Sequence, residues 1–188
     1  VAENGRNYDR KDNRHYDVIS AFIKSMRGSD PDAAILWLAV MLDGGEDPVF
    51  IARRLIIFAA EDIGNADPMA ITVATSTLTA VSNIGMPEAR INLAQAVTYR
   101  ASTSKSNASY ESINKAINYV ESQSTIEVPM HLRNNTPECK KNYKYPHSYA
   151  GNYIKQSYTD NDIPKFYNPS SNGFEKRLKD RLENLNQQ

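Results

Sequence analysis

Cysteine is almost absent from this chain: Cys139 is the only one among 188 residues. A single thiol cannot form an intramolecular disulfide, and it cannot supply a zinc site made of several cysteines. The composition fits a reducing compartment, so we expect a cytoplasmic protein. The three histidines, His15, His131 and His147, do not have metal-ligand spacing with one another or with Cys139, and we expect no metal site.

Long apolar runs and an excess of one charge are missing too. No stretch of about 18 apolar residues occurs, so we expect no membrane span, and the segment before His15 has no apolar core of a signal peptide. The chain begins with Val1, and we expect it to be a piece of a longer protein. Lys plus Arg and Asp plus Glu number 22 each. Any argument for nucleic-acid binding must therefore be local.

The phosphate-binding motif GxxxxGK[ST] is also absent. Without this Walker A loop, and without the Walker B carboxylate that holds Mg²⁺, the chain cannot bind ATP in the usual way. We therefore expect no cofactor and no enzymatic activity in it. Cys139 with His147 is an alternative, as nucleophile and base, but no surrounding signature supports this pair.

Signals that start and stop helices are frequent in the first 123 residues. Asp-Pro pairs at 30–31, 47–48 and 67–68 each supply a capping carboxylate and a proline with helical φ. Glycines shortly before these pairs suit helix C-termini, where positive φ is needed. No segment alternates with period two. The predicted fold is all-α with about six antiparallel helices, over about 15–27, 31–43, 48–63, 68–84, 87–102 and 107–123.

The second predicted helix is apolar on almost every side. Its sequence, AAILWLAVML, leaves no polar stripe to face water. This pattern predicts the central buried helix of the array, with Trp37 anchoring the core.

The character of the chain changes after about residue 124. Five prolines interrupt regular structure, and six of the eleven tyrosines fall between Tyr143 and Tyr167. Disordered segments are usually poor in aromatic residues, so we expect an ordered but irregular segment that wraps the helical body. One apolar stripe near the end predicts a last helix over about 173–186, with Phe174, Leu178, Leu182 and Leu185 on that stripe.

Four charged residues interrupt the apolar third helix. Charges in such a helix need partners, and we interpret them as an ion-pair network at a helix–helix or subunit interface. The alternative is a catalytic pair of carboxylates with an arginine clamp. Arg54 and Glu61 are seven positions apart and therefore share a face. The four residues are Arg53, Arg54, Glu61 and Asp62.

Basic residues and tyrosines are interleaved between residues 130 and 158, where Glu138 is the only acid. Basic side chains neutralise phosphates and aromatic rings stack on unpaired bases, as single-strand binding requires. The alternative is that the tyrosines pack on the helical body while the lysines face water. The candidate DNA-binding residues are Arg133, Lys140, Lys141, Tyr143, Lys144, Tyr145 and Lys155, with Lys105 in the loop SKSN as a weaker one.

Stretches of distinctive sequence are distributed over nearly the whole chain. They read HYDVISAFIKSMRGSDPDAA, WLAVMLDGGEDPVFIARRL, EDIGNADP, GMPEARINLAQAV, KSNASY, VPMHLRN, YKYPHSYAGNY and FYNPSSNGFEKRL. In these stretches the chain resembles the C-terminal region of the replication-associated recombination protein A (RarA/MgsA) family, which are AAA+ ATPases of the clamp-loader clade. Two features depart from the family: Ser104 stands where Pro is usual, and the stretch 136–144 is shorter than the family's Gly- and Lys-containing one.

The resemblance implies a collar-like all-α domain that follows the ATPase core and its lid. Residues 1–14 would be the end of the lid, 15–124 the helical oligomerisation domain, and 125–188 the wrapping segment and last helix of the same domain. It implies a DNA-dependent parent ATPase, with ATP and Mg²⁺ in its own core, acting in replication-fork maintenance, recombination and repair. The implied partners are further copies in a homotetramer, single-stranded or forked DNA at the nucleoid, and single-stranded DNA-binding protein.

Three hypotheses follow from the residues and the resemblance together. The first is a non-catalytic tetramerisation domain that holds the ATPase cores together. The second is a module that binds DNA or docks single-stranded DNA-binding protein through the tyrosine-rich segment. The third is a small enzyme, which rests only on Glu61 with Asp62 or on Cys139 with His147.

Overall fold

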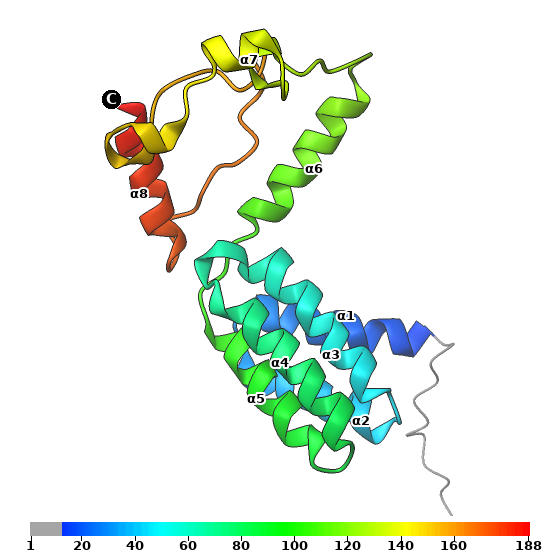
Figure 1. Cartoon of the computed structure of the whole chain (residues 1–188). Helices are drawn as coiled ribbons and strands as arrows, with labels where there is room; N and C mark the ends of the chain where they lie inside the picture. Colours follow the sequence, from blue (N-terminus) through cyan, green and yellow to red (C-terminus); the bar gives the residue numbers. More distant parts are fainter. Residues whose placement is uncertain (1–12) are drawn as a thin grey trace, which may run out of the picture. The chain divides into compact units, whose positions relative to one another are not determined.

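The computed structural model describes residues 13–188, in which helices, turns and loops occur without a strand (Figure 1). The all-α prediction is confirmed. The α-helices are α1 (Asn13–Arg27), α2 (Pro31–Asp43), α3 (Pro48–Phe58), α4 (Met69–Ile84), α5 (Ala89–Ser102), α6 (Ala108–Glu121), α7 (Pro137–Asn142) and α8 (Glu175–Asn186). The short turns are the π-helical η1 (Ala59–Ile63) and the 3-10 turns η2 (Gly64–Ala66), η3 (Met130–Leu132), η4 (Pro146–Ser148) and η5 (Ala150–Asn152).

The chain divides into two compact units. Unit 1 holds the described residues up to Ser112 together with Tyr167–Gln188, and unit 2 is Ile113–Phe166. The predicted wrapping segment is therefore split, because only its part from Tyr167 onward belongs to the helical unit. The prediction for residues 1–14 falls almost entirely on residues outside the described part.

Capping side chains fix the starts of α2 and α3 where the sequence predicts them. The carboxylate of Asp30 accepts a hydrogen bond of 2.9 Å from the backbone N–H three residues on, and Asp47 accepts one of 3.0 Å from the N–H two residues on. The end of α1 differs from the prediction. The positive φ there, 61°, belongs to Ser29 rather than to Gly28.

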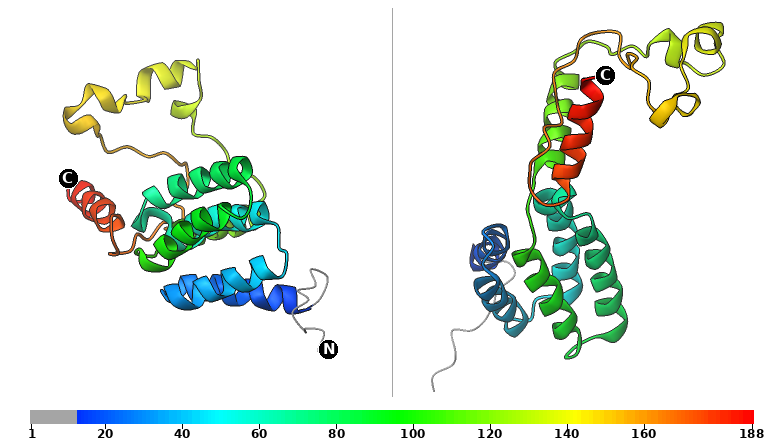
Figure 2. Two further views of the ribbon diagram at one scale, coloured as in Figure 1. Left: turned by 90° about the horizontal axis from the view of Figure 1, so that it is seen from below. Right: turned by 90° about the vertical axis from the view of Figure 1, so that its left-hand side faces the viewer.

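Unit 1 is built around α5. In Figure 2, α1 and α2 form one layer, while α3, α4 and α5 form a second. α5 packs against α1, α2, α3 and α4, whereas α2 packs chiefly against α1 and α5. The side chains of Leu93 and Val97 in α5 are completely buried. Three pairs of consecutive helices, α1 with α2, α3 with α4 and α4 with α5, pack against one another, as their short connections predict. The exception is α2 with α3, which are consecutive but have different main partners.

The prediction that α2 is the central helix is wrong. Leu36 is 57% exposed, and Trp37 lies half-buried at the edge of the core. Small residues in α5, such as Ala89 and Ala96, allow close approach of neighbouring helices on several sides, and both are buried. An apolar helix is buried only on the faces that neighbours cover, so part of α2 remains a hydrophobic surface.

Unit 2 has almost no interior of its own. Among residues 113–166, all of which the structure describes, Pro129 alone is buried. In α6 the side chains of Ile113, Ile117 and Val120 share one helix face and are 55%, 47% and 54% exposed. So small a unit cannot cover its own apolar residues. No helix within residues 13–188 has the length and apolar character needed to cross a bilayer.

Candidate functional site

A buried carboxylate, that of Glu175, fastens the start of α8 to unit 1. The side chain is fully buried, and its Oε1 accepts hydrogen bonds of 2.5 Å from the hydroxyls of Ser106 and Ser170. The backbone N–H of Ser170 donates at 2.8 Å, and Oε2 accepts from the hydroxyl of Tyr167 at 2.8 Å. We call these four residues the C-terminal clasp.

Burial and hydrogen bonding act in opposite directions on this carboxylate. Burial by itself raises the pKa of Glu175, but the donors from Ser106, Ser170 and Tyr167 outweigh it and hold the pKa below its usual range. Glu175 is therefore ionised at neutral pH, and each donor serves a charged acceptor. Hydrogen bonds of this kind are stronger than those between neutral groups.

The backbone before α8 docks beside the clasp. The N–H of Phe174 donates to the carbonyl of Ala66 at 2.8 Å, and the side-chain amide of Asn172 donates to the carbonyl of Lys105 at 3.0 Å. Gly173 has a φ of +54°, and a Cβ there would lie 2.3 Å from the oxygen of Ala66. Only glycine fits this close approach.

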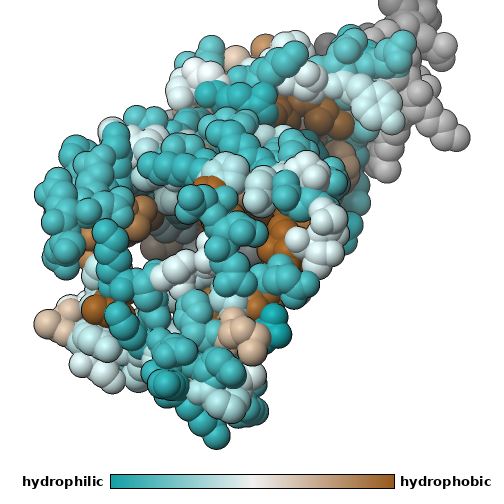
Figure 3. Space-filling view, turned by 90° about the horizontal axis from the view of Figure 1, so that it is seen from above, coloured by the Kyte–Doolittle hydropathy of each residue, from teal (hydrophilic) through white to brown (hydrophobic). Residues whose placement is uncertain are grey.

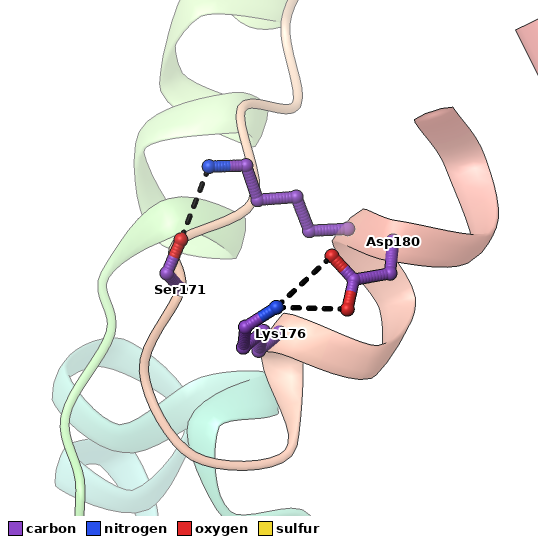
Figure 4. A network of polar contacts seen from close by, with 4 residues as sticks. Ser171, Lys176 and Asp180 are labelled. Atoms are coloured by element: carbon purple, nitrogen blue, oxygen red, sulfur yellow. Dashed lines mark hydrogen bonds and ion pairs between the residues drawn. The ribbon is translucent and has the colours of Figure 1, made fainter. Parts of the chain in front are cut away.

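Two lysines of α8 make local contacts near the start of the helix (Figure 4). Lys176 contacts the carboxylate of Asp180 at 2.9 Å, one turn along the helix, and Lys179 donates to the hydroxyl of Ser171 at 3.1 Å. Such exposed contacts contribute little to stability compared with the buried clasp.

Three segments that are far apart in the sequence meet at the C-terminal clasp. They are residues 61–68, 105–110 and 166–178, which contain EDIGNADP, KSNASY and FYNPSSNGFEKRL. The structure therefore gives these distinctive stretches a packing role: they hold the last helix in place.

The four charged residues predicted as an ion-pair network do not pair with one another. Asp62 is almost buried, and its carboxylate accepts from Nε of Arg27 in α1 at 2.7 Å. This hydrogen bond is the largest cause of the raised pKa of Arg27. In the described part of the chain, Arg53, Arg54 and Glu61 form no ion pair.

The two acids of η1 lie on different sides of the helix. Asp62 lies against α1, whereas Glu61 stays half-buried at the surface and the neighbouring Ala60 is exposed. Asp62 follows the buried Leu55 by seven positions and so continues the inward side, whereas Glu61 follows Arg54 by seven positions on the outward side.

Lys105, a candidate for DNA contact, is used within unit 1. Its ammonium donates to the carbonyl of Thr103 at 2.8 Å, to the hydroxyl of Ser29 at 2.9 Å and to the carbonyl of Ala101 at 3.2 Å. Burial lowers the pKa of Lys105. This lysine fastens the loop between α5 and α6 and is poorly placed to reach a phosphate.

The other DNA-binding candidates lie in unit 2 and are exposed. Arg133 donates from Nε to the carbonyl of Val128 at 2.8 Å, yet its side chain is 42% exposed. Tyr145 is 58% exposed, its ring 5.3 Å from that of His147, and Tyr143 is 36% exposed. The exposed lysines of the same segment are Lys140, Lys141, Lys144 and Lys155. Within unit 2, Tyr143, Tyr145, Tyr149 and Tyr158 are all exposed, so unit 2 itself does not bury them.

The histidines have structural surroundings. His15 is almost buried, and its Nδ1 lies 3.1 Å from a carboxylate oxygen of Glu46. His131 contacts the carbonyl of Ser157 at 2.8 Å through Nε2. Among residues 13–188 no group of three or more His, Cys, Asp or Glu side chains is arranged to hold a metal ion.

Sequence reasoning missed Arg100, which is completely buried in α5. Its guanidinium donates to the carbonyls of Ala96 at 2.7 Å, Leu55 at 3.2 Å and Ala70 at 3.2 Å, and so ties together α5, α3 and α4. Burial lowers the pKa of Arg100 to about 10. No sequence pattern separates this residue from an ordinary surface arginine near a helix end.

Asp67 does more than the capping predicted for it. Its carboxylate accepts from the N–H of Met69 at 3.1 Å, from the hydroxyl of Thr103 at 2.5 Å and from the hydroxyl of Tyr99. Burial opposes ionisation, but these donors hold the pKa of Asp67 below its ordinary value. The start of α4 is thereby joined to the end of α5.

Fold and contacts together define an all-α domain whose polar clusters serve packing. Residues 28–186 match the family described as the MgsA AAA+ ATPase C terminal. The chain belongs to this family.

Named relatives agree with the family match. Replication-associated recombination protein A of Coxiella burnetii is 39% identical over 195 residues, which cover 97% of this chain and 44% of that protein. The protein of the same name from Escherichia coli K12 is 36% identical, covering 100% of this chain and 44% of its own length. ATPase WRNIP1 of Dictyostelium discoideum is 37% identical over 146 residues, 78% of this chain and 17% of that protein. The chain thus spans less than half the length of these relatives.

Proposed function

We propose that this chain is the tetramerisation domain of an AAA+ ATPase and holds several ATPase cores together without catalysing a reaction itself. The observation that supports this proposal is the exposed hydrophobic surface of unit 1. On the face of the molecule drawn in Figure 3, small hydrophobic patches lie among mostly hydrophilic residues, and the exposed apolar residues of unit 1 are identified by their exposed fractions. The large apolar side chains of unit 1 that are between 40% and 61% exposed include Leu36, Ile57, Met69, Ile71, Ile84, Met86 and Ile91.

Exposed apolar side chains that form a contiguous patch are typical of an interaction surface, and we propose that these side chains contribute to such a patch. Most oligomers of soluble proteins consist of identical chains related by closed symmetry. A homotetramer built on unit 1 would bury these side chains and bring the attached ATPase cores together. The parent protein would then be a DNA-dependent ATPase of the nucleoid that acts in replication-fork maintenance, recombination and repair, with ATP and Mg²⁺ in a core outside this chain.

Light scattering coupled to size exclusion, over a hundredfold range of concentration, tests the assembly. We expect a mass near four times the 21.1 kDa of the chain. A mass of one chain throughout would overturn the proposal.

A second candidate function, DNA binding by unit 2, is favoured by the exposure of its basic residues and tyrosines. The rings of Tyr143, Tyr145 and Tyr149 are accessible to bases, and Lys140, Lys141 and Lys144 lie in the same stretch of chain. Exposed aromatic faces beside cations suit single-stranded DNA. The same segment is also the place to test docking of a single-stranded DNA-binding protein.

Fluorescence anisotropy with a labelled single-stranded oligonucleotide tests this second function. We expect binding that weakens with salt, and the variant Lys140→Ala with Lys144→Ala should lower the salt slope by about two, one for each phosphate contact. Lys115→Ala, an exposed lysine on α6, is the control that should leave the slope unchanged. Binding that is absent or independent of salt would remove DNA as a ligand of unit 2.

A further inference from the structure

We infer that two copies of the chain associate through the outward face of α3 and η1, about a two-fold axis that passes near Ile57. This inference rests on the proposed tetramer and assigns one of its interfaces. We call this surface the α3 face, and it consists of Arg53, Arg54, Ile57, Ala60 and Glu61.

The centre of the α3 face is apolar and uncovered. Ile57 is 47% exposed although it lies in a helix whose opposite side, including Leu55 and Phe58, is fully buried. Beside it, an open crevice of about 280 Å³ lies along η1 and the start of α4, with Ala60 and Ile71 among its lining residues. A flat helical partner can reach both Ile57 and this crevice.

The two ends of the α3 face carry opposite charges. Arg53 and Arg54 lie on the N-terminal side of Ile57, and Glu61 lies on the C-terminal side. None of the three forms an ion pair within residues 13–188, although Glu61 interacts electrostatically with Arg27 of α1. Charges that form no close ion pair in one copy are available to pair with a second copy.

The arrangement is complementary to itself. Ile57 lies almost midway between Arg54 and Glu61, which are about 10 Å apart along the helix axis. If a second copy runs antiparallel across Ile57, the arginines of each copy face Glu61 of the other, so each charge pair occurs twice. An isologous interface requires this pattern. A nucleic acid does not match it, because its phosphates would meet Glu61.

Reversing the charges of the α3 face tests whether two copies pair through it. In Arg53→Glu with Arg54→Glu, all charges on the α3 face are negative, so two copies repel one another. In Glu61→Arg, all are positive. We expect each variant alone to fall to a mass of two chains or one, at concentrations where the unaltered chain is a tetramer. The midpoint concentration for association should rise at least about tenfold, since like charges oppose one another across the axis.

Recombining the charges then restores the interface. An equal mixture of the two variants, or one chain carrying all three substitutions, places opposite charges face to face again and should regain the tetramer mass. Arg177→Glu with Arg181→Glu makes the same change of charge at two exposed positions of α8, outside the α3 face, and it should leave the mass unchanged. Circular dichroism checks that every variant remains helical.

The outcomes separate this inference from the proposed function. If the unaltered chain is a monomer, the tetramer proposal fails and this inference fails with it. If the unaltered chain is a tetramer that both charge variants retain, the assembly uses another surface, and only the α3 face is overturned. Loss of the tetramer without recovery in the triple variant would also overturn the two-fold pairing.

Discussion

The hydroxyl of Ser106 donates a hydrogen bond of 2.5 Å to Oε1 of Glu175, and this bond joins two residues 69 positions apart. Ser106 lies in the loop before α6, whereas Glu175 is the first residue of α8. The chain between them leaves unit 1, forms unit 2 and returns. The C-terminal clasp is therefore the point at which the end of the chain becomes part of the helical unit.

Replacing Glu175 by Gln should detach α8. The amide keeps the shape of the carboxylate but loses the charge, and its NH₂ group faces donors that need an acceptor. We expect a loss of about 2 to 4 kcal/mol in the free energy of unfolding, measured with urea. Hydrogen exchange should rise in α8 before it rises in α5. Glu183→Gln, an exposed residue of the same helix, is the control and should change stability by less than about 0.5 kcal/mol.

We expect acid to lower the free energy of unfolding, because it protonates the carboxylates of Glu175 and Asp67. Both carboxylates have folded-state pKa values below their ordinary values of 4.5 and 3.8. Their contribution is therefore complete above these ordinary values and is lost as pH falls through the lower folded-state values. Urea unfolding at pH values between about 7 and 3 should show stability falling at the acidic end. In Glu175→Gln the fall should be shallower, and an unchanged slope would show that Glu175 does not carry the effect.

Gly173→Ala should be more harmful than an alanine at another glycine of similar φ. Gly173 and Gly45 have φ values of +54° and +79°, but a Cβ at Gly45 meets nothing within 4 Å, whereas one at Gly173 lies 2.3 Å from the oxygen of Ala66. We expect Gly45→Ala to cost about 1 kcal/mol through backbone strain alone. Gly173→Ala should cost at least about 2 kcal/mol, because the clash displaces the hydrogen bond from Phe174 to Ala66. Equal melting temperatures for the two variants would contradict the close approach.

Two substitutions of Arg100 distinguish how much its volume and its charged guanidinium each contribute to the free energy of unfolding. Arg100→Ala leaves a cavity in the middle of unit 1 and should cost about 3 kcal/mol of unfolding free energy. Arg100→Met fills most of the space without burying a charge, so we expect it to cost less than about 1.5 kcal/mol. The carbonyls that accept from Arg100 lie in helices, where backbone N–H groups also donate to them. Removing the guanidinium therefore does not leave these carbonyls entirely without a donor, and the loss in free energy of unfolding is limited. If Met costs as much as Ala, the hydrogen bonds that Arg100 donates to those carbonyls, rather than its volume, stabilise the core.

Local signals predicted the helices well because each acts within a few residues. The Asp-Pro pairs at 30–31 and 47–48 start α2 and α3 at the expected residues, since a capping carboxylate needs only the next turn of backbone. The short helix α7 was missed, although Thr136 caps it through the N–H of Cys139. The surrounding residues are rich in proline and tyrosine, and this composition led us to predict an irregular segment instead of a helix.

Contacts between distant residues were not predictable in the same way. The sequence indicated that Arg53, Arg54, Glu61 and Asp62 need partners, but not that Asp62 reaches Arg27 in α1. That pairing depends on how α1 packs beside the end of α3. For the same reason Lys105, a candidate for DNA contact by its loop position, became a donor to Ser29.

The sequence by itself determined the all-α class, the starts and ends of most helices, and the family. The helices depend on capping residues and apolar periodicity, which act within a few residues. The family is identified from long stretches of sequence that are compared directly with those of its members. Only the tertiary structure decided that α5 rather than α2 is central, that Glu175 and Arg100 are completely buried, and that Ile57 remains exposed between Arg54 and Glu61. Burial depends on which elements cover a residue, and those elements come from anywhere in the chain.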